Sequence, residues 1–171
     1  MSMIRVLNFE EAKAAIPALA EIIADCVKGG ASVGFMAPCE APDFIPYWNR
    51  VVDEVEAGDT ALLVAEHDGE IVGTVQLGLS QMPNQPHRTD LKKLLIHRKA
   101  RGLGLARQLM QAAEEEARRH QKTLICLDTA TGSPAEAIYT HLGWERVGVI
   151  PNYALYPDGS PCATTLFYKG L

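Results

Sequence analysis

The sequence predicts an α/β protein with an α+β mixed sheet, formed as one domain over residues 1–171. Short runs rich in apolar residues alternate with segments whose apolar residues recur at helical spacing, in the order βααβββαβαββ. Strand pairs joined by short turns stand at both ends of this order, and strand-helix-strand units lie between them. Antiparallel and parallel pairing should therefore coexist in one sheet with helices on its faces.

The first strand and helix are placed by their end signals. A strand is expected over residues 3–8. Asn8 with Glu11 three residues later fits a capping box, which starts a helix at the next residue. Pro17 should kink or restart this helix because proline lacks the N–H group of an interior turn, and the glycine pair at 29–30 should end it.

The later elements follow from signals of the same kind. An Asp-Gly pair at 68–69 between two apolar runs favours a hairpin. The apolar run over 123–129 is typical of a strand buried on both faces. Ser133 before Pro134 is expected to cap a short helix. The expected strands cover 61–66, 70–80, 90–97, 123–129, 145–155 and 162–169, and the expected helices cover 42–57, from the glycines near 104 to about 120, and 133–142.

Composition argues against several functional classes. The formal net charge is -5, whereas a general nucleic-acid binder is basic over much of its surface. The first residues do not show the basic segment followed by an apolar run that is typical of an export signal. No apolar run approaches the ~20 residues of a membrane helix. Its four cysteines fit no Cys-x-x-Cys motif. We therefore expect a cytoplasmic protein with no metal and no nucleic-acid or membrane partner.

A glycine-containing loop joins a predicted strand to a predicted helix at residues 97–110, HRKARGLGLARQLM. First-turn amides and the positive end of a helix dipole suit a phosphate, and Gly102 and Gly104 let the backbone approach it closely. The loop lacks the Gly-Lys-Ser/Thr of a P-loop, and Arg107 stands where a dinucleotide fingerprint needs Gly or Ala. By itself it predicts either an anion site or a tight strand-to-helix turn.

The run LKKLLIHRKARGLGLARQLM resembles the acetyl-coenzyme A (acetyl-CoA) segment of the GCN5-related N-acetyltransferase (GNAT) family. That family carries Gln/Arg-x-x-Gly-x-Gly/Ala at a strand-to-helix junction, and residues 101–106 match it as RGLGLA. The family's Val-x-Pro appears at 96–98 as Ile-His-Arg, so its proline is missing. The segment EAIYTHLGWERVG is similar to the family's Tyr-x-x-x-Gly-Phe, with Tyr139, Gly143 and Trp144 at those positions.

This resemblance implies a site for the pyrophosphate and pantetheine of acetyl-CoA. The strand before the loop would offer backbone groups to the pantetheine arm, and the loop would hold the phosphates. The family's asparagine seven residues before the tyrosine is replaced here by Gly132, so Ser133 or an amide beside it would substitute. The implied cofactor-binding residues are Leu94, Leu95, Ile96, Arg101, Gly102, Leu103, Gly104, Leu105, Ala106 and Ser133.

The resemblance also implies that an amine attacks the thioester directly, where two parallel strands separate. Tyr139 holds the family's position for the acid that protonates the leaving thiolate, since a phenol pKa lies modestly above a thiol pKa; an aromatic that fills the core is the alternative. Asp128, at the end of a buried strand, is the first candidate for the base, and it equally fits a strand-end residue that bonds the following turn. Glu40, Asp43, Asp90 and a relayed water are the other candidates.

Three stretches resemble a narrower group, the tabtoxin resistance acetyltransferase type: PNQPH, LDTATGSPAEAIY and GVIPNYALYPDGSPCATTLFYK. This implies a small-molecule amine acceptor that is amino-acid-like or antibiotic- or toxin-like. Acidic groups would suit a cationic amine, although ordinary surface polarity is the favoured explanation for any single one of these residues. Peptide or protein N-acetylation and a non-catalytic acyl-CoA-binding domain are alternatives, and a homodimer is a base-rate expectation. The candidate substrate-binding residues are Glu40, Asp43, Gln76, Asn84, Gln85 and Tyr153.

Overall fold

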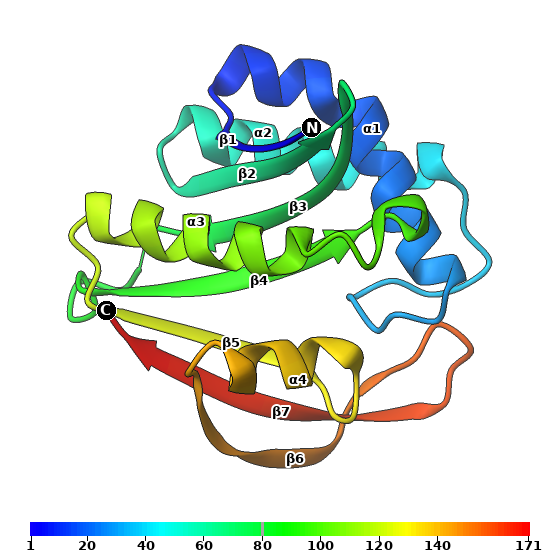
Figure 1. Cartoon of the computed structure of the whole chain (residues 1–171). Helices are drawn as coiled ribbons and strands as arrows, with labels where there is room; N and C mark the ends of the chain where they lie inside the picture. The colour runs from blue at the N-terminus through cyan, green and yellow to red at the C-terminus, as the bar shows by residue number, and fades with distance from the viewer. Residues whose placement is uncertain (80) are drawn as a thin grey trace.

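The computed structural model describes residues 1–79 and 81–171, which form a sheet with helices on both faces (Figure 1). The strands are β1 (Ser2–Val6), β2 (Thr60–His67), β3 (Glu70–Gly78), β4 (Arg88–Ile96), β5 (Leu124–Ala130), β6 (Glu145–Leu155) and β7 (Pro161–Gly170). The helices are α1 (Phe9–Lys28), η1 (Ala41–Phe44), α2 (Ile45–Glu56), η2 (Arg98–Ala100), α3 (Leu105–Arg119) and α4 (Pro134–His141), η1 and η2 being short 3-10 helices. The strands and α-helices follow the predicted order; Ser80, the last residue of the strand expected over 70–80, lies outside the described residues.

The strands form one sheet in the order β1-β2-β3-β4-β5-β7-β6. Neighbouring strands are antiparallel except for β4 and β5, which run parallel because α3 carries the chain back between them. The mixed sheet predicted from the sequence is therefore confirmed.

Side chains of β2 alternate between two hydrophobic cores, one on each face of the sheet. Leu62 and Val64 pack with α1 and α2, whereas Leu63 and Ala65 pack with α3 on the other face. All four side chains are buried. Figure 1 shows α3 and α4 on the same side of the sheet, and Tyr139 of α4 belongs to the core under α3. The strand is apolar at successive positions because both of its faces are covered.

Strands β4 and β5 separate soon after they begin. Their parallel pairing joins residues 88–90 to residues 124–126, and no pairing between them continues beyond that point in the part of the chain that the structure describes. In Figure 1 the two ribbons diverge toward η2 and α4. Residues 91–96 of β4 therefore approach the glycine loop without a hydrogen-bonded strand on their β5 side.

The first helix begins as predicted, and the second does not. Asn8 and Glu11 form both hydrogen bonds of the capping box, each 3.0 Å long. Helix α1 continues through Pro17 as one helix, so the proline does not restart it. The helix expected from Pro42 begins instead as η1 and becomes α-helical only at Ile45.

The start of α4 differs from the prediction in its hydrogen bonds. Ser133 is the N-cap residue and Pro134 opens the helix, but the serine side chain makes no capping hydrogen bond. Its hydroxyl lies 3.2 Å from the Thr129 hydroxyl, and the Glu136 carboxylate accepts the Gly132 N–H instead. The Ser133 side chain is thus turned toward the end of β5.

Within residues 1–79 and 81–171, no helix combines the length and apolar character needed to cross a membrane. In the same residues, no three His, Cys, Asp or Glu side chains gather in a way that could hold a metal ion.

Candidate functional site

The loop between β4 and α3 presents backbone amides to solvent. Gly102 and Gly104 have φ angles of 81° and 73°, which favour glycine, and a Cβ built on either would meet no atom within 4 Å beyond its chain neighbours. The first hydrogen bond inside α3 runs from the Gln108 N–H to the Gly104 carbonyl (3.2 Å), so the three amides ahead of Gln108 have no partner inside the helix. The loop therefore offers an open anion site at the positive end of a helix.

Two cations tie this loop to the rest of the domain. Arg98 donates its backbone N–H (2.9 Å) and its guanidinium to the Asp25 carboxylate on α1. Burial acts to raise the pKa of Asp25, but the hydrogen bonds from Arg98 outweigh it and hold that pKa below its ordinary value. Lys99 pairs with Glu70 at the start of β3. These two side chains position the loop and are already engaged by carboxylates.

Two other cations at this loop keep exposed side chains. Arg101 donates to the Ile96 carbonyl (3.2 Å) and forms a longer ion pair with the Asp25 carboxylate (3.8 Å), and 54% of its side chain is exposed. Arg107 is exposed in the first turn of α3 and makes no hydrogen bond or ion pair with the residues that the structure describes. Together with the free amides, they give the site its positive charge.

The other residues implied in cofactor binding surround this loop. Leu94, Leu95 and Ile96 end β4 where it diverges from β5. The Leu105 side chain is buried in the core, so its amide, and not its side chain, can meet a ligand at the loop. Leu103 is 45% exposed at the tip of the loop. The predicted residues of this part of the site are therefore brought together, apart from Ser133, which lies across the divergence at the end of β5.

Tyr139 is buried, and its ring packs between other aromatic rings. The ring centroids of Phe167 and Trp144 lie 5.6 Å and 6.0 Å from that of Tyr139. Burial raises the Tyr139 pKa; a hydrogen bond with Thr129 lowers it, and the nearby Asp128 charge raises it further. The pKa of the phenol is therefore further above that of a thiol than we assumed from the sequence. The phenol is protonated at neutral pH, and it lies near Thr129 and Asp128 of β5.

Asp128 is exposed at the end of β5 and bonds to the neighbouring strand. Its carboxylate accepts the Thr164 hydroxyl of β7 (3.0 Å). Burial and the charge of Lys92 lower the pKa of Lys93 on β4, whereas the Asp128 charge acts in the opposite direction. Because it also acts on Tyr139, Asp128 lies near side chains on both sides of the divergence. The two roles expected for it, base and strand-end residue, are compatible in one position.

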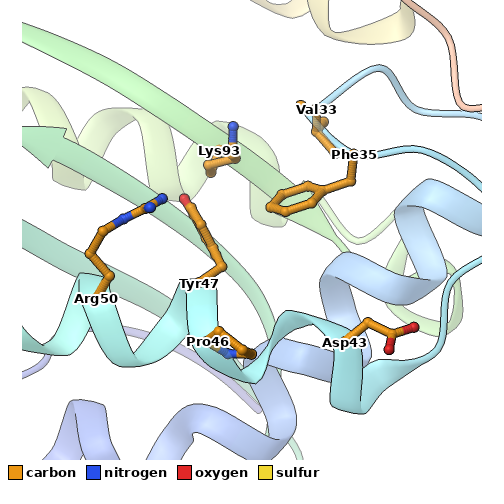
Figure 2. A pocket seen from close by; sticks show the side chains of 8 residues that line it. Val33, Phe35, Asp43, Pro46, Tyr47, Arg50 and Lys93 are labelled. Atoms are coloured by element: carbon orange, nitrogen blue, oxygen red, sulfur yellow. The ribbon is translucent and has the colours of Figure 1, made fainter.

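A cavity of about 420 Å³ opens between α2 and β4 (Figure 2). The Tyr47 hydroxyl accepts a hydrogen bond from the Gln76 amide (3.1 Å), and Gln76 is fully buried. Gln76, predicted to contact the acceptor, therefore supports Tyr47 from beneath. The cavity is lined by Val33, Gly34, Phe35, Asp43, Pro46, Tyr47, Arg50 and Lys93.

The two acidic residues expected to bind the acceptor are engaged elsewhere. Asp43 lines the cavity, but its carboxylate accepts the Glu40 N–H (2.8 Å). In Figure 2 that carboxylate points away from the part of the cavity between α2 and β4. The Glu40 carboxylate pairs with Lys28 (2.7 Å), is 76% exposed and lies outside the cavity lining.

The remaining predicted acceptor residues also lie outside the cavity lining. Gln85 accepts a hydrogen bond from Arg88 (3.0 Å), and Asp90, an alternative base, pairs with the same arginine (2.5 Å). Both thus lie at the paired end of β4, away from the glycine loop, and Asn84 is exposed beside them. Tyr153 is 53% exposed on β6.

The prominent cavity residues Tyr47, Arg50 and Lys93 were not predicted from the sequence. Tyr47 and Arg50 are three residues apart, so helical spacing would have placed them on one face of α2. Lys93 gave no comparable signal. Its φ angle is 56°, and the β3–β4 register shifts opposite it, so alternation along the strand does not reveal its direction.

The chain matches acetyltransferases over most of its length. The model of the acetyltransferase (GNAT) family matches residues 29–144. An N-alpha-acetyltransferase of Sulfurisphaera tokodaii is 28% identical over 127 residues, which are 69% of this chain and 74% of that protein. An uncharacterized N-acetyltransferase encoded in the hisH-hisA intergenic region of Azospirillum brasilense is 36% identical over 106 residues, 61% of each protein. The solved structure of yncA from Salmonella typhimurium, which contains its cofactor acetyl-CoA, has a TM-score of 0.80 at 19% identity, over 99% of this chain and 94% of that one.

Proposed function

We propose a reaction for this chain from the premise that it belongs to the acetyltransferase (GNAT) family, as an N-acetyltransferase. It moves an acetyl group from acetyl-CoA to an amine of a small molecule, by direct attack while both substrates are bound. The acceptor is amino-acid-like or antibiotic- or toxin-like, as the resemblance to the tabtoxin resistance type suggests. The observation that carries the proposal is the open glycine loop at the point where β4 and β5 diverge.

The loop fits the diphosphate of acetyl-CoA in both charge and space. Its free amides, with Arg101 and Arg107, offer hydrogen bonds and positive charge. Gly102 and Gly104 have no neighbouring atoms where a side chain would stand, so a ligand can approach the backbone closely. The side of β4 that is not paired with β5 leads away from this loop. Its free backbone groups could hydrogen-bond to an extended pantetheine arm.

Two side chains at the divergence have the chemistry that the transfer needs. Acetyl-CoA would supply a thioester, whose carbonyl carbon is open to attack by a neutral amine. Asp128 would accept the proton that an ammonium group must lose, directly or through water, because such groups titrate near 10.4. Tyr139 keeps its proton at neutral pH and would donate it to the departing sulfur.

The proposal is tested first by calorimetry with acetyl-CoA and then by thiol release. Acetyl-CoA is offered with amino acids, β-lactams, aminoglycosides, polyamines or peptides as acceptors. We expect acetyl-CoA to bind and at least one small amine to release free CoA thiol in equal amount with the acetylated amine. Binding without thiol release from any amine would identify a non-catalytic acyl-CoA-binding domain. The absence of binding would show that the glycine loop is not an acetyl-CoA site.

A second candidate is acetylation of a peptide or protein amine at the same cofactor site. The relative from Sulfurisphaera tokodaii, named as an N-alpha-acetyltransferase, favours it. The two candidates differ in the acceptor: a small-molecule enzyme should have a higher kcat/KM for a free amine than for a peptide with the same N-terminal residue. The reverse order would favour the second candidate.

A further inference from the structure

We infer that the acceptor of this enzyme carries an oxyanion, a carboxylate in the case of an amino acid, that binds to Arg50 and Lys93 beside Tyr47. This inference rests on the proposed function, because it assigns the acceptor to the cavity between α2 and β4. It adds the chemical class of the acceptor: an amine that also bears a negative charge.

Both cations lie over the same aromatic ring. The Arg50 guanidinium carbon is 5.4 Å from the centroid of the Tyr47 ring, and the Lys93 ammonium nitrogen is 5.9 Å from it. In Figure 2 the Tyr47 side chain lies beside Arg50 and below Lys93, whose nitrogen points away from Tyr47, and Phe35 lies on the other side of Lys93 from Arg50. Two positive charges from different elements, α2 and β4, thus lie near the same aromatic ring of the cavity lining.

Neither charge is neutralised within the part of the chain that the structure describes. No ion pair with a carboxylate joins Arg50 or Lys93 there, and the one acidic side chain in the lining, Asp43, is engaged by a backbone N–H and points away. Burial is the main cause that lowers the pKa of Lys93. The positive charges of Lys92 and Arg50 lower it further, and the negative charge of Asp128 acts to raise it. A local excess of positive charge in a chain of net charge -5 suits an anionic group of the ligand.

The aromatic wall beside the cations is held in one position. Tyr47 accepts the hydrogen bond from buried Gln76, and its ring meets those of Phe35 and Trp48 edge-on at 5.3 Å and 5.1 Å. Trp48 is fully buried. The ring is therefore preorganised, and the oxyanion need not order it on binding.

This position also suits the transfer. Lys93 lies on the part of β4 that is not paired with β5, and Asp128 is near enough to affect the pKa of Lys93. In an α-amino acid the amine is one carbon away from the carboxylate. If the carboxylate binds at Arg50 and Lys93, the amine can point toward the place where β4 and β5 diverge, and Asp128 lies there. From the sequence we expected acidic groups to bind the amine, whereas the cavity supplies cations for the rest of the acceptor.

The inference is tested with matched acceptors that carry either a carboxylate or its uncharged amide, and rates are compared over a series of pH values because the amide also lowers the pKa of the neighbouring amine. Phenylalanine, methionine and leucine are each compared with their amides in the thiol-release assay. We expect at least one free acid to have a kcat/KM about ten- to a hundred-fold above that of its amide, the range of one charge-assisted hydrogen bond. Arg50→Gln and Lys93→Gln should each reduce this preference. Lys92→Gln, which removes the same charge outside the cavity lining, should keep it.

Binding without acetyl-CoA gives a measurement that does not depend on turnover. Calorimetry compares N-acetylphenylalanine with its amide, on the wild type and the same three variants. We expect the free acid to bind about ten-fold or more tightly, and Arg50→Gln to abolish the difference. Equal binding of acid and amide to the wild type, or a preference that survives both Arg50→Gln and Lys93→Gln, would overturn the inference. Thiol release from acids and amides at equal rates would overturn it while leaving the proposed function intact; no thiol release from any amine would reject the proposed function.

Discussion

At the scale of single residues, Tyr139 combines packing and chemistry in one side chain. Its ring packs against Phe167 and Trp144, so Tyr139→Phe should fold normally and lose only the hydroxyl. We expect turnover to fall by about 100-fold or more, since a positioned acid contributes about 10²–10⁴-fold. The Kd for acetyl-CoA in calorimetry should not change, because the proposed phosphate site is the glycine loop. Wild-type turnover would leave Tyr139 with a packing role alone.

Asp128 allows its two expected roles to be separated. Asp128→Asn removes the base but keeps an oxygen that can accept the Thr164 hydroxyl, whereas Thr164→Val removes that hydrogen bond and keeps the carboxylate. If Asp128 is the base, Asp128→Asn should lower kcat by about 100-fold and alter the acidic limb of the pH–rate profile, while Thr164→Val retains both. Similar kinetics in the two variants would assign Asp128 to the strand end.

At the scale of elements, the junction of β4 and α3 depends on backbone freedom rather than on side chains. Gly104 has a φ angle of 73°, so Gly104→Ala should cost about 1–2 kcal/mol in strain and also place a methyl group where phosphates would approach. We expect the KM for acetyl-CoA to rise about ten-fold or more. Gly58→Ala is the matched control, because Gly58 has a φ angle of 77° and open space but lies in the turn before β2. It should lower the unfolding free energy similarly and leave KM unchanged; an equal rise in KM would show that strain alone is responsible.

At the scale of the whole molecule, the predictable features were those with a local cause. The order of elements, the capping box at Asn8 and the loop at Gly102 follow from periodicity and end signals within a few residues. The cavity required contacts between distant segments: Lys93 turns by a positive φ angle, and Tyr47 reaches it from α2. No sequence pattern encodes such a meeting, so the open glycine loop was predicted and the cavity between α2 and β4 was not.

At the scale of the whole molecule, the contact between Asp25 and Arg98 joins α1 to the loop after β4. The Asp25 pKa is lowered by Arg98 despite burial, so the charged carboxylate stabilises the fold above its unfolded pKa of ~3.9, and this contribution is lost as the pH falls through the lower folded pKa. The Asp25 side chain is only 10% exposed. Asp25→Asn should therefore lower the unfolding free energy by about 1–3 kcal/mol at pH 7.

The deficit of Asp25→Asn relative to the wild type should shrink as the pH falls below about 4, because the wild-type carboxyl then takes up its proton. Urea titrations between pH 3 and pH 7 measure both proteins. Asp53→Asn is the control, because Asp53 is exposed on α2 and forms no ion pair with the rest of the described chain. It should match the wild type throughout. A deficit in Asp25→Asn that is the same at pH 3 and pH 7 would mean that the charge of Asp25 does not hold the loop to α1.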